Sequence, residues 1–307
     1  QKPDEARFEQ AVLDFKDQIP NIAARLLELI NTEHTRNARF IAAFNDFTQL
    51  CSTTLNPKIS VNEIKEMLVQ HLLTERLFRT VFDNPDFVQN NVIASKIENV
   101  IKALTSRTFN RAEFLRSLDP FYSAIEAAAR DLETWSERQT FLNTVYERFF
   151  QGFAVKQADT HGIVYTPQEI VDFMVASVDE VLKREFNQSL ATPGVKILDP
   201  AVGTGNFIVN IIKRVAEESR SALRQKYAND LFCNEITLLP YYIASLNIEH
   251  EYYEQMREYV PFEGVCFADT LELAESGQLS LFAEENTARV AREKATAIRV
   301  VIGNPPY

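Results

Sequence analysis

The first glycine of this 307-residue chain is Gly152, and the whole chain contains only eight glycines. Sheet-rich folds need glycine at their tight turns, so a glycine-free stretch of this length predicts an all-helical region. Apolar residues there recur at helical spacing, for example at Ile22, Leu26 and Ile30. We therefore predict an all-α helical bundle over residues 1–160. The helices are expected to break at four prolines: Pro20, Pro57, Pro85 and Pro120.

Residues 161–307 follow a different pattern. Short β-rich runs alternate there with stretches of helical periodicity, which predicts an α/β domain with a Rossmann-like, doubly wound parallel sheet. Ligands of such sheets bind beyond the carboxyl ends of the strands, so the residues that follow each run form the candidate site. The four predicted strands are residues 195–198, 231–234, 265–267 and 300–302.

The charge of the chain limits what it can bind by itself. The net charge is −11, of which −3 falls in residues 1–160 and −8 in residues 161–307. Modules that coat the phosphate backbone of nucleic acids are usually basic. Any surface that holds DNA must therefore be local, or lie outside this chain.

The cysteines and the hydropathy pattern indicate the compartment. Cys51, Cys233 and Cys266 are far apart and form no C-x-x-C pair, so neither a disulfide scaffold nor a metal site is predicted. The N-terminus is too polar for a signal peptide. No run approaches 18 apolar residues, so no membrane span is predicted. These features together predict a cytoplasmic protein.

The first candidate site follows the first predicted strand and reads Asp199-Pro200-Ala201-Val202-Gly203-Thr204-Gly205-Asn206-Phe207. Two glycines two positions apart let the backbone turn sharply and approach a ligand closely. A bare G-x-G also occurs in nucleotide-binding loops. The leading Asp-Pro-Ala and the trailing Phe are more specific.

Three further signals surround this loop. Tyr165-Thr166-Pro167, followed by Glu169, predicts a capping box in which Thr166 is the N-cap of a helix. Glu235 ends the second strand, where an acidic residue can accept both hydroxyls of a ribose. Asp269 follows the third strand, where an aspartate by itself is more often a turn residue.

The most specific signal is Asn304-Pro305-Pro306-Tyr307, at the end of the fourth predicted strand. In order, the signals resemble motifs X, I, II, III and IV of gamma-class N6-adenine DNA methyltransferases. With YERFF at 146–150 and HGIVYTP at 161–167, the chain is most similar to Type ISP restriction-modification enzymes, which are single-polypeptide and ATP-dependent. In these enzymes a helical coupler joins a helicase-like motor to the methyltransferase.

The resemblance implies a coupler or spacer domain over residues 1–160 and a methyltransferase domain over residues 161–307. It also implies S-adenosyl-L-methionine as the cofactor. Asp199 is then expected to hold the ammonium end of the cofactor, and Asp269 its adenine amino group. The implied cofactor-binding residues are Tyr165, Thr166, Asp199, Ala201, Gly203, Gly205, Phe207, Glu235 and Asp269.

The chemistry of the target explains the residue types of the fourth motif. The amino nitrogen of adenine is a poor nucleophile, because its lone pair is delocalised into the ring. The amide oxygen of Asn304 and the carbonyl of Pro305 can each accept one amino hydrogen, and the prolines lock the backbone in place. Tyr307 offers a face on which an extruded base can stack. Methyl transfer then gains mainly from positioning. The predicted catalytic residues are Asn304, Pro305, Pro306 and Tyr307.

The chain departs from the family pattern at its end, because it stops at Tyr307, directly after the fourth motif. It also lacks a G-x-x-x-x-G-K-[ST] motor loop. We therefore expect a piece of a larger enzyme that is inactive alone, with an incomplete sheet and an exposed edge strand. The expected partners are double-stranded DNA, bound through a target-recognition domain absent here, and helicase and nuclease modules on the same parent chain.

Other functions remain open at this point. Protein-glutamine N5 methyltransferases also use N-P-P-Y after a helical domain, although they usually carry a shorter D-x-G-T-G loop and lack Y-T-P. Cytosine-N4 methyltransferases usually have serine at the position of Asn304. A non-catalytic coupling module that merely retains a cofactor pocket is the third alternative.

Overall fold

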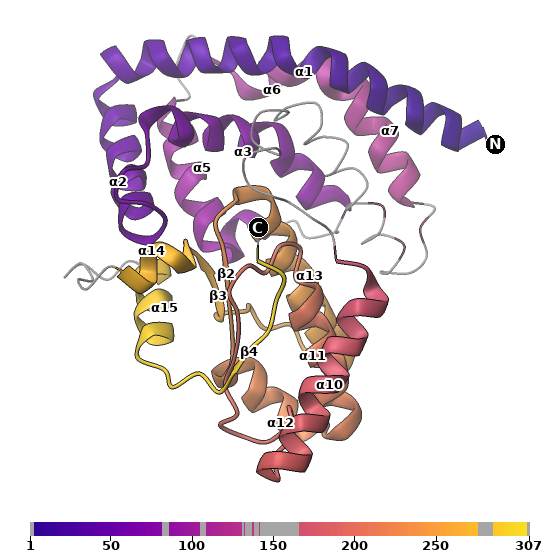
Figure 1. The fold of residues 1–307 in the computed structure, drawn as a ribbon. Coiled ribbons are helices and arrows are strands. Elements are labelled where there is room, and N and C mark those ends of the chain that lie inside the picture. The colour runs from indigo at the N-terminus through magenta and orange to yellow at the C-terminus, as the bar shows by residue number, and fades with distance from the viewer. Residues whose placement is uncertain are drawn as a thin grey trace. The chain divides into compact units, whose positions relative to one another are not determined.

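The computed structural model describes residues 3–81, 86–104, 109–130, 132, 137, 141, 166–275 and 285–305 (Figure 1). The chain divides into two compact units. The first comprises residues 1–49 and 59–161, and the second comprises residues 50–58 and 162–307.

Every secondary-structure element described before residue 166 is a helix or a helical turn. They are α1 (Pro3–Arg36), α2 (Ala38–Thr54), α3 (Val61–Val81), α4 (Phe87–Asn90), α5 (Val92–Leu104), α6 (Arg111–Leu115), the 3₁₀ turn η1 (Arg116–Leu118) and α7 (Asp119–Arg130). Helix α7 packs against α1 and α3. The described part of this region therefore has the helical character that the lack of glycine predicts.

The predicted break at Pro20 is wrong, because α1 continues through this residue. A proline inside a helix removes one backbone hydrogen bond and disfavours the helix by about 3 kcal/mol. Residues on both sides of it, including Ile19, Ile22 and Leu26, are buried, and their packing keeps the helix intact. The breaks near Pro57 and Pro120 agree with the structure, since α2 ends at Thr54 and α7 begins at Asp119. Pro85 lies outside the described residues.

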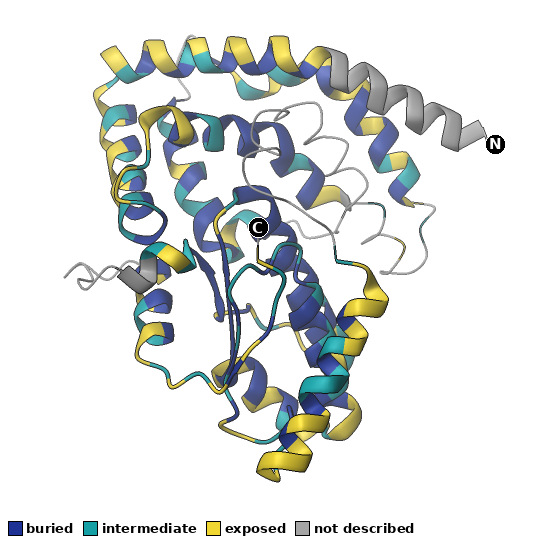
Figure 2. Ribbon diagram, in the orientation of Figure 1, coloured by how far each residue is buried: buried dark blue, intermediate teal, exposed yellow. Residues whose placement is uncertain are grey.

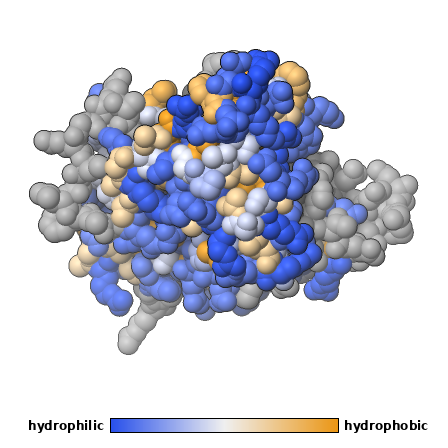
Figure 3. Space-filling model, turned by 90° about the horizontal axis from the view of Figure 1, so that it is seen from below, coloured by the Kyte–Doolittle hydropathy of each residue, from blue (hydrophilic) through white to orange (hydrophobic). Residues whose placement is uncertain are grey.

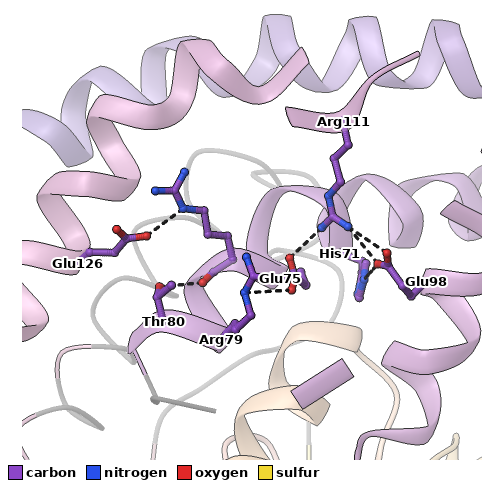
Figure 4. A network of polar contacts seen from close by, with 8 residues as sticks. His71, Glu75, Arg79, Thr80, Glu98, Arg111 and Glu126 are labelled. Atoms are coloured by element: carbon purple, nitrogen blue, oxygen red, sulfur yellow. Dashed lines mark hydrogen bonds and ion pairs between the residues drawn. The ribbon is translucent and has the colours of Figure 1, made fainter. Parts of the chain in front are cut away.

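A network of charged side chains ties helices of the first unit together (Figure 4). Arg111 on α6 donates from Nη1 to Glu98 on α5 and from Nη2 to Glu75 on α3, each over 3.0 Å. Nε2 of the fully buried His71 lies 3.1 Å from the same Glu98 carboxylate. Burial lowers the pKa of His71, and the hydrogen bond to Glu98 opposes that shift. His71 is thus a core histidine, and no group of metal-binding residues occurs among those described.

The second unit contains a four-stranded parallel sheet in the order β3-β2-β1-β4. Its strands are β1 (Ile197–Asp199), β2 (Leu231–Glu235), β3 (Val265–Phe267) and β4 (Val300–Val301). Its helices are α10 (Gln168–Phe186), α11 (Asn206–Glu218), α12 (Arg220–Gln225), the π-helical turn η2 (Lys226–Asp230), α13 (Leu238–Met256), α14 (Thr270–Glu275) and α15 (Glu285–Lys294). The parallel sheet is confirmed, and each strand lies within two residues of its predicted bounds.

Helices cover the sheet on two sides. Helix α13 packs against α11, β2 and β3, whereas α15 packs against β3. Figure 1 shows α13 and α15 on opposite faces of the sheet. Helix α13 is buried over most of its length, as are β2 and β3 (Figure 2). Parallel strands covered on both faces need nearly continuous apolar sequences, which explains why Leu231-Phe232-Cys233 and Val265-Cys266-Phe267 lack polar alternation.

The buried face of α10 differs from the expected one. Periodicity suggests an apolar stripe that contains Ile170 and Phe173, but these side chains are 48% and 71% exposed. The helix instead buries Val171, Val175 and Leu182, together with Asp179. The Asp179 carboxylate accepts hydrogen bonds from Arg214, Lys183 and the backbone of Leu190. These contacts of Asp179 determine which of two overlapping apolar faces of α10 is buried. A hydropathy pattern does not distinguish the two faces.

None of the described helices is both long and apolar enough to cross a bilayer. The face drawn in Figure 3 is mainly hydrophilic, and its apolar side chains are scattered rather than gathered into one patch.

Candidate active site

The parallel sheet brings the predicted site residues to one edge. Asp199 and Glu235 are the last residues of β1 and β2, and Asp269 comes two residues after β3 ends. Asn304 comes three residues after β4 ends. Because all four strands run in the same direction, their carboxyl ends meet on one side of the sheet. Tyr165, Pro306 and Tyr307, which were also predicted, lie outside the described residues.

The loop after β1 has the shape that its two glycines permit. Gly203 and Gly205 adopt φ values of 56° and 96°, a region that side chains other than glycine rarely occupy. A Cβ atom at Gly205 would lie 3.3 Å from the Cα of Ala244, so the glycine also allows close packing on α13. Helix α11 follows at Asn206, with the Phe207 side chain buried. The loop thus presents backbone rather than side chains at the strand end.

Asp199 is completely buried, and its charge is only partly compensated. Its Oδ1 atom accepts a hydrogen bond of 3.1 Å from the backbone N–H of Ala201, whereas Oδ2 has no partner among the described residues. Burial, with a smaller contribution from the nearby Glu235 charge, raises the pKa of Asp199 to about 8. A buried carboxylate oxygen without a partner favours a cationic or hydrogen-bond-donating ligand.

Glu235 connects the end of β2 to the glycine loop. Its Oε2 accepts a hydrogen bond of 2.9 Å from the backbone N–H of Gly203. Its Oε1 accepts from both the backbone N–H and the hydroxyl of Thr237. Burial raises the pKa of Glu235, and these hydrogen bonds oppose the shift. Because each carboxylate oxygen can accept more than one hydrogen bond, Glu235 retains capacity for a ligand hydroxyl.

The side chain of Asp269 accepts hydrogen bonds from the backbone of the helix that follows it. Its Oδ1 accepts from the backbone N–H groups of Leu271, over 2.9 Å, and Glu272, over 3.4 Å. This is the turn and cap behaviour expected of an aspartate ahead of a helix. The carboxylate is partly exposed, so its second oxygen can still meet a ligand.

The predicted capping box at Thr166 is wrong. Helix α10 begins at Gln168, its N-cap is Pro167, and no side chain caps it. The hydroxyl of Thr166 instead accepts a hydrogen bond of 3.0 Å from Nδ2 of Asn304. Thr166 and Asn304, which are 138 residues apart, therefore meet through their side chains.

This contact has a chemical consequence for Asn304. An amide group carries one donor end and one acceptor end. Because Thr166 accepts from the Nδ2 end, the Oδ1 end of Asn304 is left to accept from a substrate. Asn304 is partly buried, and the following Pro305 is exposed.

Gly303 is a site residue that the sequence analysis missed. A Cβ atom there would lie 2.4 Å from Oδ1 of Asp199 and 3.2 Å from Cδ of Pro200. Only glycine allows the chain after β4 to approach the end of β1 this closely. The one available signal was the position of this glycine directly before Asn304.

Replacement of Gly303 by alanine is expected to lower the free energy of unfolding by about 1–3 kcal/mol, because the added methyl group overlaps the fixed Asp199 carboxylate. Urea unfolding followed by circular dichroism measures this change. Gly194→Ala is the matched control, since Gly194 has φ of 81° but nothing within 4 Å of an added Cβ. Strain alone predicts about 1 kcal/mol there. Wild-type stability in Gly303→Ala would contradict the close approach.

Comparison with known proteins agrees with these features. Residues 12–137 match the family described as the coupler domain of Type ISP restriction-modification enzymes. Residues 137–307 match the family described as N-6 DNA methylase. No curated protein matches the chain.

Three solved structures resemble the whole chain. A cryo-EM structure of a DrdV–DNA complex is 37% identical with a TM-score of 0.85, and the match covers 100% of this chain and 30% of that one. A nuclease-deletion mutant of the Type ISP enzyme LlaGI, in complex with a DNA substrate mimic, is 34% identical with a TM-score of 0.86, over 96% of this chain and 24% of that one. The ATP-dependent Type ISP enzyme LlaBIII, bound to DNA, is 34% identical with a TM-score of 0.87, over 96% and 20%.

This chain therefore spans less than a third of the length of each of these relatives. The N-6 DNA methylase match covers more than half of the chain and includes the ends of all four strands. The region ahead of it matches the model of the Type ISP coupler domain, and the chain itself belongs to the N-6 DNA methylase family.

Proposed function

We propose that this chain carries the methyl-transfer site of a DNA methyltransferase that acts on N6 of adenine within a restriction-modification enzyme. The observation that carries the proposal is the hydrogen bond from Asn304 to Thr166, which leaves an amide oxygen available to a planar amine. Membership of the N-6 DNA methylase family supports the same reaction. We also propose that residues 1–160 act as the coupler, and that residues 161–307 belong to a doubly wound, Rossmann-like methyltransferase domain.

S-adenosylmethionine is the proposed cofactor, and it supplies an electrophilic methyl group on a sulfonium ion. The unpartnered oxygen of the buried Asp199 suits the ammonium group of the cofactor, because a cation beside it favours the ionised carboxylate that burial alone disfavours. Glu235 would accept from the ribose, and Asp269 from the adenine amino group. The backbone turn of Ala201, Gly203 and Gly205, followed by Phe207, would surround the methionine portion. Thr166, together with Tyr165, would line the pocket near α10.

The reacting amine would be held by two acceptors, the Oδ1 atom of Asn304 and the carbonyl oxygen of Pro305. Each accepts one amino hydrogen, which directs the nitrogen lone pair toward the methyl group. The Pro305-Pro306 pair restricts the backbone, and Tyr307 would stack on the extruded base. Catalysis then depends on orientation rather than on a strong base.

Double-stranded DNA is the proposed substrate. The three related structures are complexes with DNA or with a DNA substrate mimic, which supports this choice. The net charge of −8 in residues 161–307 suggests that surfaces other than this region supply most of the contacts to phosphate. Helicase and nuclease modules on the same polypeptide, and a cytoplasmic location, are further proposals that the Type ISP coupler match favours.

Two measurements on the full-length gene product test this function. Calorimetry should detect binding of S-adenosylmethionine, and Asp199→Ala should abolish it. Incubation with labelled cofactor and duplex DNA should give N6-methyladenine, identified by mass spectrometry after digestion of the DNA. Label found on a protein glutamine or on cytosine N4 would replace the proposal with one of those activities. Cofactor binding without any transfer would favour a coupling module.

Replacement of Thr166 by valine is expected to lower the rate of methyl transfer about threefold to tenfold, the value of one ordinary hydrogen bond. Valine has nearly the same shape but no acceptor, so the Asn304 amide loses its fixed orientation. Single-turnover kinetics with saturating cofactor measure the change. Thr166→Ser restores an acceptor and should restore most of the rate. Equal rates for the valine and serine variants would remove Thr166 from this role.

A further inference from the structure

A chain of hydrogen bonds links three strand ends beneath the candidate pocket. The hydroxyl of Thr270, at the start of α14, donates to the carbonyl oxygen of Pro200 over 2.7 Å. Nδ2 of Asn234, on β2, donates to the same Thr270 hydroxyl over 3.0 Å. The same Nδ2 also donates to Oε1 of Glu293, on α15, over 2.8 Å. These hydrogen bonds thus join one loop, one strand and two helices.

The direction of each bond in this chain is fixed by its members. A carbonyl oxygen cannot donate, so the single hydroxyl hydrogen of Thr270 must go to Pro200. The hydroxyl can then only accept from Asn234, which therefore presents Nδ2 and not Oδ1. Both hydrogens of that amide are used, and Oδ1 of Asn234 has no partner among the described residues. Only one orientation of the Thr270 hydroxyl and of the Asn234 amide therefore allows these three hydrogen bonds.

The inner part of this hydrogen-bond chain is buried. Asn234 is fully buried and Glu293 is 7% exposed, whereas Thr270 and Pro200 are partly exposed. Polar groups removed from water destabilise the fold unless they are paired. If the Thr270 hydroxyl were lost, the buried Asn234 amide would lose one of its two acceptors.

Three of the four linked residues are adjacent in sequence to a proposed cofactor ligand. Pro200 follows Asp199, and Thr270 follows Asp269. Asn234 precedes Glu235. The three acidic residues are proposed to hold the ammonium, adenine and ribose groups of one extended molecule. The hydrogen-bond chain therefore connects the three segments that carry the proposed ligands. The separation of these segments sets the length of the pocket.

We propose that Thr270 and Asn234 are positioning residues that fix the spacing between the ends of the S-adenosylmethionine pocket. This inference rests on the proposed function. Thr270 joins the loop of Asp199, at the methionine end, directly to the turn of Asp269, at the adenine end. Without its hydroxyl the two ends are no longer held at a set distance, and a ligand that must reach both binds less tightly. A ligand that reaches only one end is little affected.

Two ligands separate this role from a purely structural one. S-adenosylmethionine spans the whole pocket, whereas 5′-methylthioadenosine lacks the amino acid end. Thr270→Val is expected to weaken binding of S-adenosylmethionine about tenfold, the value of two hydrogen bonds. Binding of 5′-methylthioadenosine should change less than about twofold on the same argument. Calorimetry on the full-length gene product gives both dissociation constants.

Three further variants complete the experiment. Thr270→Ser retains the hydroxyl and should bind both ligands as the wild type does. Glu293→Gln retains the acceptor for Asn234 and should also resemble the wild type. Thr270→Ala is measured beside Thr270→Val, because it removes the hydroxyl without placing a methyl group against Pro200. Cooperative thermal unfolding shows which variants fold.

The outcomes are distinct. Selective loss of S-adenosylmethionine affinity in Thr270→Val or Thr270→Ala, with recovery in Thr270→Ser, supports the positioning role. Wild-type affinity in folded Thr270→Val and Thr270→Ala overturns it, and so does an equal loss of affinity for both ligands in these two variants. If the wild-type protein binds neither ligand, the proposed function itself fails, and the inference fails with it.

Discussion

Replacement of Asn304 by alanine should lower the rate of methyl transfer by about 10²- to 10³-fold, as removal of one preorganised hydrogen-bonding group in an active site does. The alanine variant loses the amide oxygen proposed to accept an amino hydrogen of adenine. It retains the Pro305 carbonyl, so residual transfer is expected. The amide is engaged by Thr166 and not by the glycine loop, so affinity for S-adenosylmethionine should stay within about twofold.

Single-turnover transfer of labelled methyl groups to duplex DNA, combined with calorimetry of cofactor binding, separates the two effects. Asn210→Ala is a matched control, because the Asn210 amide donates only to the backbone of its own helix. That variant should retain the wild-type rate. A rate for Asn304→Ala within a factor of three of the wild type would remove Asn304 from the chemistry.

Replacement of Asp199 by asparagine should act in opposite directions on stability and on cofactor binding. The pKa of Asp199 is raised from 3.8 to about 8, mainly by burial. Between these two values the folded protein holds a proton that the unfolded chain has released. Stability is therefore lost as the pH rises through this window, and the full penalty is present above pH 8. A shift of this size corresponds to roughly 5 kcal/mol as an upper limit.

The neutral asparagine avoids this penalty. Asp199→Asn should therefore be more stable than the wild type at pH 9 by a few kcal/mol, with the difference disappearing toward pH 4. Without a charged partner for the ammonium group, its affinity for S-adenosylmethionine should fall roughly 10- to 100-fold. Chemical unfolding at several pH values and calorimetry test the two effects. Asp172→Asn, on an exposed part of α10, should alter neither. Equal stability of Asp199→Asn and the wild type at pH 9 would show that the buried Asp199 carboxylate does not destabilise the fold.

The strands were the part of the fold best predicted from sequence. Each contains a short run of apolar residues, and β1 is followed directly by Pro200, which cannot donate a backbone hydrogen bond to a sheet. Two helical features were predicted wrongly because tertiary packing overrides local preference. Burial on both sides of Pro20 keeps α1 continuous, and the buried Asp179 carboxylate selects the inner face of α10.

The candidate site was predictable as a set of strand ends, but its internal contacts were not. The sequence signals bring Asp199, Glu235 and Asn304 to one edge, since parallel strands end together. The partner of Asn304 lies 138 residues away, and the partner of Thr270 lies 70 residues away. Such pairs depend on how loops from different strands meet. A hydropathy or capping pattern carries no information about that geometry.

The order of strands in the sheet also bears on how the molecule is made. Strands β1, β2 and β3 pair with their nearest neighbours in the chain, whereas β4 joins β1 from much farther along. Closing a longer loop is slower and entropically harder. Because β4 occupies the free edge of β1, it can dock without opening the strands already paired. During synthesis on the ribosome, the strand ends that carry the proposed cofactor ligands can therefore form before Asn304, the residue proposed to hold the base, has emerged.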